Sequence, residues 1–250
     1  MVFQAGELLY PAIAVIFLLA GTLKGVLGFG LPMISMALLP FFVSIEQAVS
    51  ISALVAPFTN LLQLFSSGNI KGAVKFVWPV IVALFVGVIF THWFLQGIEG
   101  EWLLLLVGAT ILLFCCLEFS GFRFNIEEHS RTRFALGFGF LAGIAGALTA
   151  LNGWAFVLYL VGCNLSRAMF RSSIAVLFIV SGILVSSSFW ALGWITGQTI
   201  WFGLIALAAS FVGMWIGDKI GQRVPNEQFR KIILFALAVL GSIIVARAFS

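Results

Sequence analysis

The feature that most constrains this chain is a succession of continuous apolar runs that fills almost all of its 250 residues. A helix needs roughly 17–25 apolar residues to cross the hydrocarbon core of a bilayer, and most of the runs approach that length. The runs do not alternate between apolar and polar residues, which disfavours membrane β-strands. They span residues 8–23, 29–43, 47–66, 74–95, 102–117, 134–150, 152–163, 168–192, 198–217 and 230–247.

Composition supports the same conclusion. Hydrophobic residues make up 62% of the chain and charged residues only 9%, whereas soluble domains carry about 25% charged residues. The chain is therefore expected to be an all-α polytopic membrane protein with the lipid bilayer as its surroundings. The net charge of +4 is spread over loops and indicates no nucleic-acid partner.

The reactive residue types point away from catalysis. Cys115, Cys116 and Cys163 lie inside apolar runs without metal-ligand or redox spacing, so they are interpreted as small packing residues. The sequence has two histidines and no carboxylate well inside an apolar run. A membrane enzyme would need a nucleophile, an acid–base pair or a metal cluster at depth. We therefore expect no enzyme activity, no metal and no cofactor.

An internal repeat is predicted from two matches between the halves of the chain. Residues 87–103 align without gaps on residues 213–229. Two glycine triplets share one spacing, and each lies near the end of the first apolar run of its half: Gly21, Gly25 and Gly28, and Gly139, Gly143 and Gly146. The most polar stretch lies between the halves. The expected organisation is a first transmembrane repeat at 1–118, a cytoplasmic linker at 119–133 and a second repeat at 134–250.

The distribution of charge predicts how the halves are oriented. Lys and Arg collect in cytoplasmic loops. If 67–73, 118–133, 164–171 and 218–230 face inside, with Lys75 and Lys231 at their edges, only Lys24 and Arg247 of the 13 basic residues lie elsewhere. The outer loops then hold Glu7, Glu46, Glu99 and Glu101.

Equivalent loops of the two halves differ in charge: residues 96–101 hold two glutamates, whereas residues 218–230 are basic. Such loops face opposite sides, so each half crosses the membrane an odd number of times. This predicts two homologous halves in an inverted-topology repeat, with the N-terminus outside. Each half has five crossings if the short segments 29–43 and 152–163 span, and three if they are re-entrant.

The short segments predict where a ligand binds. GTLKGVLGFGLP (21–32) and GFLAGIAGALTALNG (139–153) are glycine-interrupted and lie at matching positions, which is the sequence pointer to the site of an inverted-repeat transporter. Clustered glycines let a helix break, and Pro32 can begin a new one. A broken helix exposes N–H groups that favour an anion. We therefore expect an anion site at these broken segments.

Individual side chains suggest how an anion would be held. Lys24 costs about 3 kcal/mol at membrane depth and has no acidic neighbour in its run, so it is interpreted as an anion ligand, with snorkelling to the interface as the alternative. Asn152 lies at the second break, where either a ligand or gating role or simple helix capping would explain it. Arg167 and Arg171 share a helix face and can clamp an oxyanion, or merely follow the positive-inside rule. Ser172 opens the next run and can line the path.

Several of these segments resemble one known family. GFGLP, its echo GIAGALTALNG, the following NLSRAMFRSSIAV and the segment GMWIGDKIGQRVP resemble the TauE/SafE sulfite exporter family of membrane permeases (TSUP) over nearly the whole chain. The resemblance implies transport of small sulfur-containing anions such as sulfite and organosulfonates. It also implies that the motif glycines form site backbone, namely Gly25, Gly28, Gly30, Gly143 and Gly146.

The expected function is therefore secondary transport by alternating access in the cell (inner) membrane, most simply export of sulfite or an organosulfonate. The alternatives left open are an importer of another small oxyanion and a non-transporting membrane scaffold or sensor. The expected partners are a small anionic substrate and the bilayer, and a homodimer is left open as the oligomeric state.

Overall fold

Helices follow the apolar runs throughout the computed structural model, which describes residues 8–67, 69–122, 124–221 and 226–249. In that part of the chain there is no strand, and each of the ten runs corresponds to one α-helix. The helices are α1 (Leu9–Leu27), α2 (Leu31–Leu38), α3 (Ile45–Ser67), α4 (Ile70–Leu95), α5 (Gly100–Ser120), α6 (Arg131–Thr149), α7 (Gly153–Gly162), α8 (Arg167–Ala191), α9 (Gly197–Gly221) and α10 (Asn226–Arg247), with 3-10 turns η1 (Leu39–Phe41) and η2 (Glu128–Ser130). Glu7, Arg123 and Arg223 lie outside the described residues.

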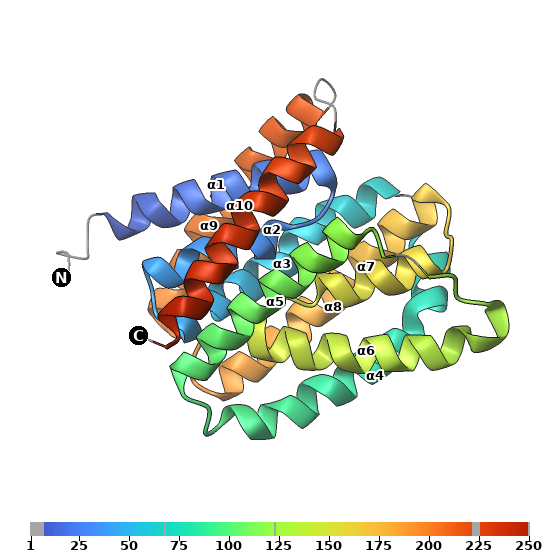
Figure 1. Cartoon of the computed structure of the whole chain (residues 1–250), viewed down its shortest axis with the longest axis horizontal. Coiled ribbons are helices and arrows are strands. Elements are labelled where there is room, and N and C mark those ends of the chain that lie inside the picture. Colours follow the sequence, from blue (N-terminus) through green and yellow to red (C-terminus); the bar gives the residue numbers. More distant parts are fainter. Residues whose placement is uncertain (1–7, 68, 123, 222–225, 250) are drawn as a thin grey trace.

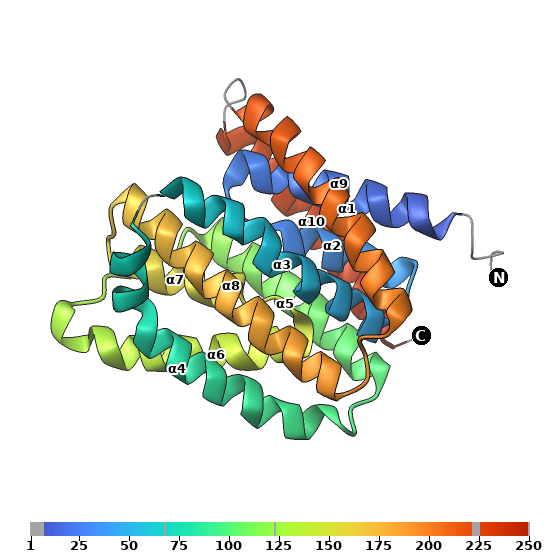
Figure 2. The ribbon, with the colours of Figure 1, turned by 180° about the vertical axis from the view of Figure 1, so that it is seen from behind.

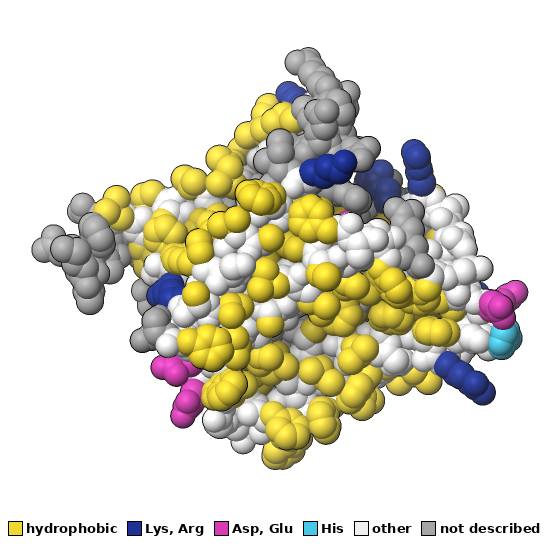
Figure 3. All heavy atoms as spheres, in the orientation of Figure 1, with side chains coloured by type: hydrophobic (Ala, Val, Ile, Leu, Met, Phe, Trp, Pro, Cys, Tyr) yellow, Lys and Arg dark blue, Asp and Glu magenta, His cyan; other side chains and the backbone are white. Residues whose placement is uncertain are grey.

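The chain is a multi-pass membrane protein. Among the described residues, 7 helices are long and apolar enough to cross a bilayer: α1, α3, α4, α5, α6, α8 and α9. Their outward faces are apolar, as the exposed side chains of Trp78, Phe85 and Trp201 illustrate. Figure 3 shows this apolar surface across the middle of one face, with most of the Lys and Arg side chains of that face toward one end.

The two predicted short helices are confirmed. With eight residues, α2 is about 12 Å long, and with ten residues α7 is about 15 Å long. The hydrocarbon core is about 30 Å thick, so neither helix alone can span it. α2 begins with Pro32 in its first turn, as expected for a residue without a backbone N–H.

Successive helices run in alternating directions along the long axis of the molecule (Figures 1 and 2). α1 begins at the end where the N-terminus lies, and α6 begins at the opposite end, beside the linker (Figure 1). The turns that follow α3 and α7 also lie at the linker end, so the predicted inner loops 67–73, 118–133 and 164–171 gather on one side. The linker is attached there, because the Ile126 N–H donates to the Gly162 carbonyl at 2.8 Å.

Glycines set the closest helix contacts. In one pair, Gly21 and Gly25 of α1 lie against the backbone of α9, and a Cβ at Gly25 would be 2.4 Å from the Met214 carbonyl oxygen. In the other pair, Gly139 and Gly143 of α6 lie against α4, and a Cβ at Gly143 would be 2.5 Å from the Leu84 carbonyl oxygen. The first helix of each half thus packs on the fourth helix of the other half. Small residues allow such close backbone approach in membrane proteins.

The centre of the bundle is formed by α3 and α8, the two most buried of the candidate spans. They cross where Pro57 of α3 meets Gly182 of α8, and a Cβ at Gly182 would be 2.6 Å from the proline ring. α5 packs on α10, and the short helices α2 and α7 pack against α3 and α8, respectively. Both helix breaks therefore lie beside the central crossing.

Candidate functional site

The first break separates α1 from α2. α1 ends with Gly28 at φ 81°, whose N–H donates to the Lys24 carbonyl at 2.7 Å, and Gly30 has φ 100°. Both values lie in the left-handed region that glycine tolerates best. Phe29 stands between these two glycines. The predicted break is confirmed at these residues, and it turns the chain from α1 into α2 within three residues.

The second break lies between α6 and α7 and is built differently. Ala150, with φ 57°, caps α6 and donates its N–H to the Gly146 carbonyl at 2.9 Å. Ala150 thus forms the left-handed C-cap of α6, as Gly28 forms that of α1. The predicted equivalence of Gly28 and Gly146 is wrong, because Gly146 lies one turn inside α6. A Cβ at Gly146 would be 2.7 Å from the Asn152 side-chain nitrogen, so this glycine makes room for the Asn152 amide.

Asn152 connects the second break to α8. Its side chain is 5% exposed, makes no capping hydrogen bond to α7, and donates through Nδ2 to the Ser181 hydroxyl. The capping alternative for the side chain is therefore wrong. Pro32 from the first break lines the same small void, of about 10 Å³, as Asn152 and Ser181. That volume is at the lower limit for one water molecule, so the two breaks meet at a nearly closed point.

Lys24 lies in the last turn of α1 and points into the bundle. It is 4% exposed, and its Nζ donates a hydrogen bond to Thr59 Oγ1 of α3 at 3.1 Å. The snorkelling alternative does not hold in this arrangement. Among the described residues, Thr59 is its one hydrogen-bond partner and no carboxylate lies within ion-pair distance. A buried cation without a counterion is costly, and an ammonium offers three donors, so two donors remain for a ligand.

A cavity of about 700 Å³ opens at the linker end of the first break. Gly25 and Gly28 line it from α1, Arg167 and Arg171 line it from the start of α8, and Asp218 lines it from α9. Both arginines are exposed, and neither makes an ion pair with a residue that the structure describes. Ser166 starts α8 by accepting the Met169 N–H at 3.3 Å, which places Arg167 and Arg171 on successive turns. A carboxylate, sulfonate or sulfite can bridge such a pair.

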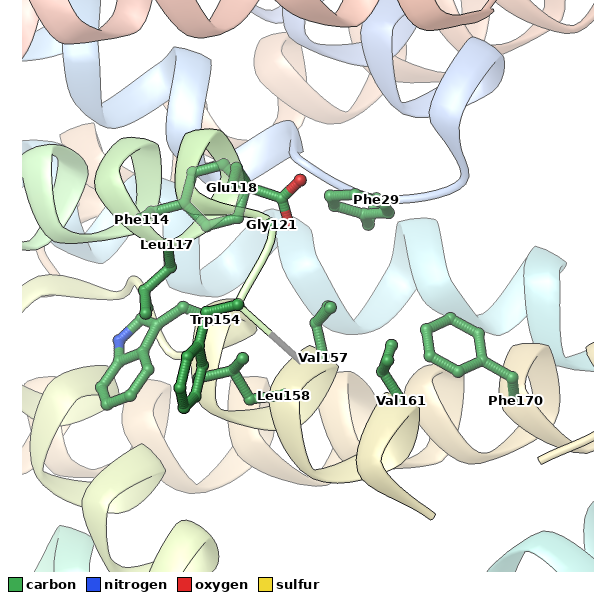
Figure 4. Close-up of a pocket in the computed structure, with 11 residues that line it drawn as sticks. Phe29, Phe114, Leu117, Glu118, Gly121, Trp154, Val157, Leu158, Val161 and Phe170 are labelled. Carbon is green, nitrogen blue, oxygen red and sulfur yellow. The ribbon is translucent and has the colours of Figure 1, made fainter. Parts of the chain in front are cut away.

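A second compartment, of about 200 Å³, adjoins this cavity. Phe29, Val161 and Phe170 line both spaces. Figure 4 shows the compartment between the end of α5, which supplies Phe114 and Glu118, and α7, which supplies Trp154. Its lining is mostly apolar and aromatic.

The structure brings together some of the sequence-predicted residues and separates others. Gly25, Gly28, Arg167 and Arg171 share the large cavity, while Asn152 lies at the closed void. Gly143 serves the contact between α6 and α4 and lines neither space. Ser172 is fully buried, and its hydroxyl donates to the Ala168 carbonyl at 3.0 Å within α8.

Sequence reasoning missed several residues of these spaces. Thr59 and Ser181 are hydroxyl residues in apolar helices, of a kind that occurs at many other positions of the chain. Phe29 and Phe170 are two of 27 phenylalanines, so nothing local distinguishes them. Asp218 has a usable signal, because it is one of two acidic residues, with Glu227, in the otherwise basic stretch 218–230.

Two other polar features lie apart from the cavity. His92 Nδ1 is 2.8 Å from the Ser188 hydroxyl, which links the ends of α4 and α8 away from the linker. The described residues contain no group of three or more His, Cys, Asp or Glu side chains placed to hold a metal ion.

Comparison with known proteins gives one match. A family model described as "Sulfite exporter TauE/SafE" matches residues 13–244, which begin in α1, end in α10 and include both breaks and the linker. No match was found among curated proteins or solved structures.

Proposed function

Since the chain belongs to the sulfite exporter TauE/SafE family, whose members are membrane transporters of sulfite or related anions, we propose that it exports small sulfur-containing anions as a secondary transporter. The substrate is sulfite or an organosulfonate, and it passes the two helix breaks by alternating access. The family match confirms the resemblance to this family that the sequence motifs indicate. It also agrees with transport rather than catalysis.

The observation that carries the proposal is the gathering of cations at the first break. Arg167 and Arg171 line the cavity without an ion-pair partner among the described residues, and Asp218 supplies one opposing charge. Lys24 precedes Gly25 in α1 and is buried, and among the described residues its hydrogen-bond partner is Thr59. An anion would meet the exposed arginines first and the buried lysine second, in surroundings of decreasing dielectric where charge interactions strengthen.

The proposed mechanism uses an inverted repeat. Three features support this architecture: the first helices of the halves start at opposite ends (Figure 1), α1 packs on α9 as α6 packs on α4, and both halves carry one short helix after a break. Transporters of this kind bind substrate at the interface of the repeats and expose it to each side in turn.

The structure corresponds, in this proposal, to a state open toward the linker. The large cavity opens at that end, while the void between Pro32 and Asn152 is nearly closed. With the linker in the cytoplasm and the N-terminus outside, as the charge distribution predicts, the state is inward-facing and ready to accept an anion for export. Opening of the far side would require the α1–α2 and α6–α7 breaks to shift relative to the α3–α8 crossing.

The experiment is efflux of sulfite from proteoliposomes. Lys24→Met and Arg171→Gln should each slow efflux at least tenfold, because each removes a cation that contributes about 1.5–3 kcal/mol as a charged hydrogen-bond donor. Lys71→Gln is the matched control, since Lys71 is exposed at the same end of the bundle but does not line the cavity.

Equal efflux from wild type and Lys24→Met, with both proteins correctly inserted, would show that Lys24 does not contribute to transport. No efflux of any sulfur anion in either direction, with binding retained, would favour the scaffold or sensor alternative. Uptake without efflux would favour the importer.

A further inference from the structure

α6 carries a groove on the face that turns away from its helix contact. Gly139 and Gly143 pack α6 on α4, whereas a Cβ at Gly137 would meet nothing within 4 Å. Residues two apart on a helix point to different sides, so Gly137 faces outward, where a membrane helix meets lipid. The groove has a volume of about 380 Å³ and starts at the linker end of α6, and its lining consists of Ser130, Arg133, Phe134, Gly137, Phe138 and Leu141.

Gly137 forms the floor of the groove, because it leaves the helix backbone uncovered. Phe134 and Leu141 stand about one turn to either side and are 40% and 47% exposed. The linker supports this wall through Phe124, whose ring lies 5.8 Å from that of Phe134 and stacks at 5.7 Å on that of Phe138. Rings held by such contacts form a ready-made apolar surface, which lowers the cost of ordering a ligand.

The groove is polar at its linker end. Arg133 is exposed and makes no ion pair with a residue that the structure describes. The Ser130 hydroxyl makes no capping hydrogen bond to α6. Glu127 and Glu128 precede the groove in the sequence but do not line it, and the Glu127 carboxylate lies 3.1 Å from the His129 ring. A guanidinium and a hydroxyl are thus available to an anion at the start of the helix.

A phospholipid combines these two chemistries at the right depth, because its phosphate lies at the membrane interface and its acyl chains lie in the hydrocarbon core. Leu141 is about 12 Å beyond Arg133 along α6, so the apolar part of the groove extends into the core. Arginine binds phosphate oxygens through paired donors, and basic pockets at membrane helices bind anionic headgroups. A second copy of the chain in the same orientation would instead bring Arg133 toward its own counterpart.

We propose that this groove binds one anionic phospholipid of the linker-side leaflet, with its phosphate at Arg133 and Ser130 and an acyl chain along Gly137 and Leu141. The inference does not depend on the transport proposal, because the groove shares no lining residue with the cavity at the first break. An anionic headgroup is favoured over a zwitterionic one, since Arg133 has no counterion among the described residues.

The test is native mass spectrometry of the full chain in detergent, titrated with phosphatidylglycerol or phosphatidylcholine of identical acyl chains. Wild type should bind one phosphatidylglycerol with a dissociation constant about fivefold lower than that for phosphatidylcholine, because a basic residue near the surface favours an anionic headgroup by about that factor. Glycerophosphate, which has the phosphate but no acyl chain, should not compete at the same concentration.

Two variants separate the headgroup contact from the chain contact. Arg133→Gln should bring the ratio of the two dissociation constants to about one. Gly137→Leu fills the floor of the groove and should weaken binding of both lipids about fivefold, and Gly137→Ala is a smaller filling that serves if Gly137→Leu does not fold. The matched controls are Lys75→Gln and Gly97→Leu. Lys75 is exposed near the linker end of α4, a Cβ at Gly97 would meet nothing within 4 Å, and neither residue lines the groove.

Four results would overturn the inference. The first is equal affinity of wild type for the two lipids, or a phosphatidylglycerol preference that persists in Arg133→Gln. The second is unchanged lipid binding by the filling variant, because the lipid would then bind elsewhere. The third is competition by glycerophosphate, which would show a site for free phosphate. The fourth is a dimer that Gly137→Leu dissociates, which would show that a second copy covers the groove. Sulfite efflux remains the separate test of the proposed function.

Discussion

Adding one methyl group at Gly139 should destabilise the protein, whereas the same change two residues earlier should not. Both glycines belong to α6, but they face different surroundings. A Cβ at Gly139 would lie 2.4 Å from the Val80 carbonyl oxygen and 2.9 Å from the Ala83 Cβ of α4, whereas a Cβ at Gly137 would meet nothing within 4 Å. Ordinary contact begins at 3.4 Å. α6 and α4 would therefore have to separate by about 1 Å to accept Gly139→Ala.

The magnitude follows from this separation. Overpacking of a well-packed contact costs about 1–3 kcal/mol, and a gap of about 1 Å forfeits part of the dispersion energy along the whole interface. Gly137→Ala instead gains up to about 1 kcal/mol of helix propensity. The two variants should differ by about 2–4 kcal/mol, which corresponds to about 4–16 °C in Tm for a chain of this size.

The assay follows the reaction of a fluorogenic maleimide with Cys115, which is 2% exposed in the native state. Cys116 and Cys163 are first replaced by alanine, so that the signal reports unfolding at one buried thiol. Gly21→Ala should behave like Gly139→Ala, since its Cβ would lie 2.4 Å from the Ser210 carbonyl oxygen of α9. Equal Tm values for the variants at Gly137 and Gly139 would refute the reasoning.

Three further predictions concern the breaks and the orientation. Asn152→Leu should slow anion efflux at least tenfold in proteoliposomes by removing the hydrogen bond to Ser181, and wild-type efflux would contradict a role for this contact. Gly28→Ala should lower Tm by a few °C because φ is +81° there, although a Cβ at this position would meet nothing within 4 Å. Gly28→Asn should lower Tm less, because Asn tolerates the left-handed conformation better than Ala. The reverse order would argue against backbone strain. In a cysteine-free background, Glu128→Cys should react with an impermeant maleimide only from the cytoplasm, and Gly97→Cys should react only from outside. Labelling from the opposite sides would show that the predicted orientation is wrong.

Most of the fold could be predicted because the membrane imposes a simple rule on the sequence. Continuous apolar runs must form helices there, and the same runs locate the short helices α2 and α7, of which α2 covers only Leu31–Leu38 of the run 29–43. The first break was also predictable, because Gly28, Gly30 and Pro32 each have a specific backbone preference. α1 and α6 begin at opposite ends of the molecule (Figure 1); the inverted repeat itself and the side that is cytoplasmic stay predictions.

The second break could be placed but not explained from sequence. Alanine is the best helix former, so nothing at Ala150 predicts a left-handed residue. The conformation is held by its surroundings: the Leu151 N–H donates to the Thr149 hydroxyl at 3.2 Å, and the Asn152 amide is fixed by Ser181. The contact between Asn152 and Ser181 joins residues 29 positions apart and leaves no local pattern.

Glycine is the residue type whose role at the site is hardest to predict from the sequence. The same residue that lets a ligand approach the backbone also lets two helices touch. Gly25 lines the cavity and also packs against α9, so it has both the ligand-facing role and the helix-contact role. Gly143 packs against α4 and does not line the cavity. The aromatic compartment was missed because it is assembled from α5, α7, α8 and the first break, which are adjacent only in the folded chain.

The last prediction concerns the driving force. Among the described residues, carboxylates of the membrane helices lie only in their end turns, as Glu46, Glu118 and Asp218 do. Coupled transporters often place Asp, Glu or His relays inside the bundle. Here His92, paired with Ser188, is the one histidine in a described span. Transport driven by the membrane potential needs no such relay, so we expect anion export to be electrogenic.

The membrane potential is sufficient for this purpose. It contributes about 2.3 kcal/mol per charge per 100 mV, and about 1.4 kcal/mol corresponds to a factor of ten. A monovalent anion would thus be expelled to roughly a fifty-fold gradient by 100 mV, negative inside, and a divalent anion to the square of that. The measurement is sulfite flux in proteoliposomes under an imposed potential, without a pH or sodium gradient, with His92→Gln as the comparison. Flux that ignores the potential, follows a proton gradient and is lost in His92→Gln would show instead that the His92–Ser188 pair couples transport to protons.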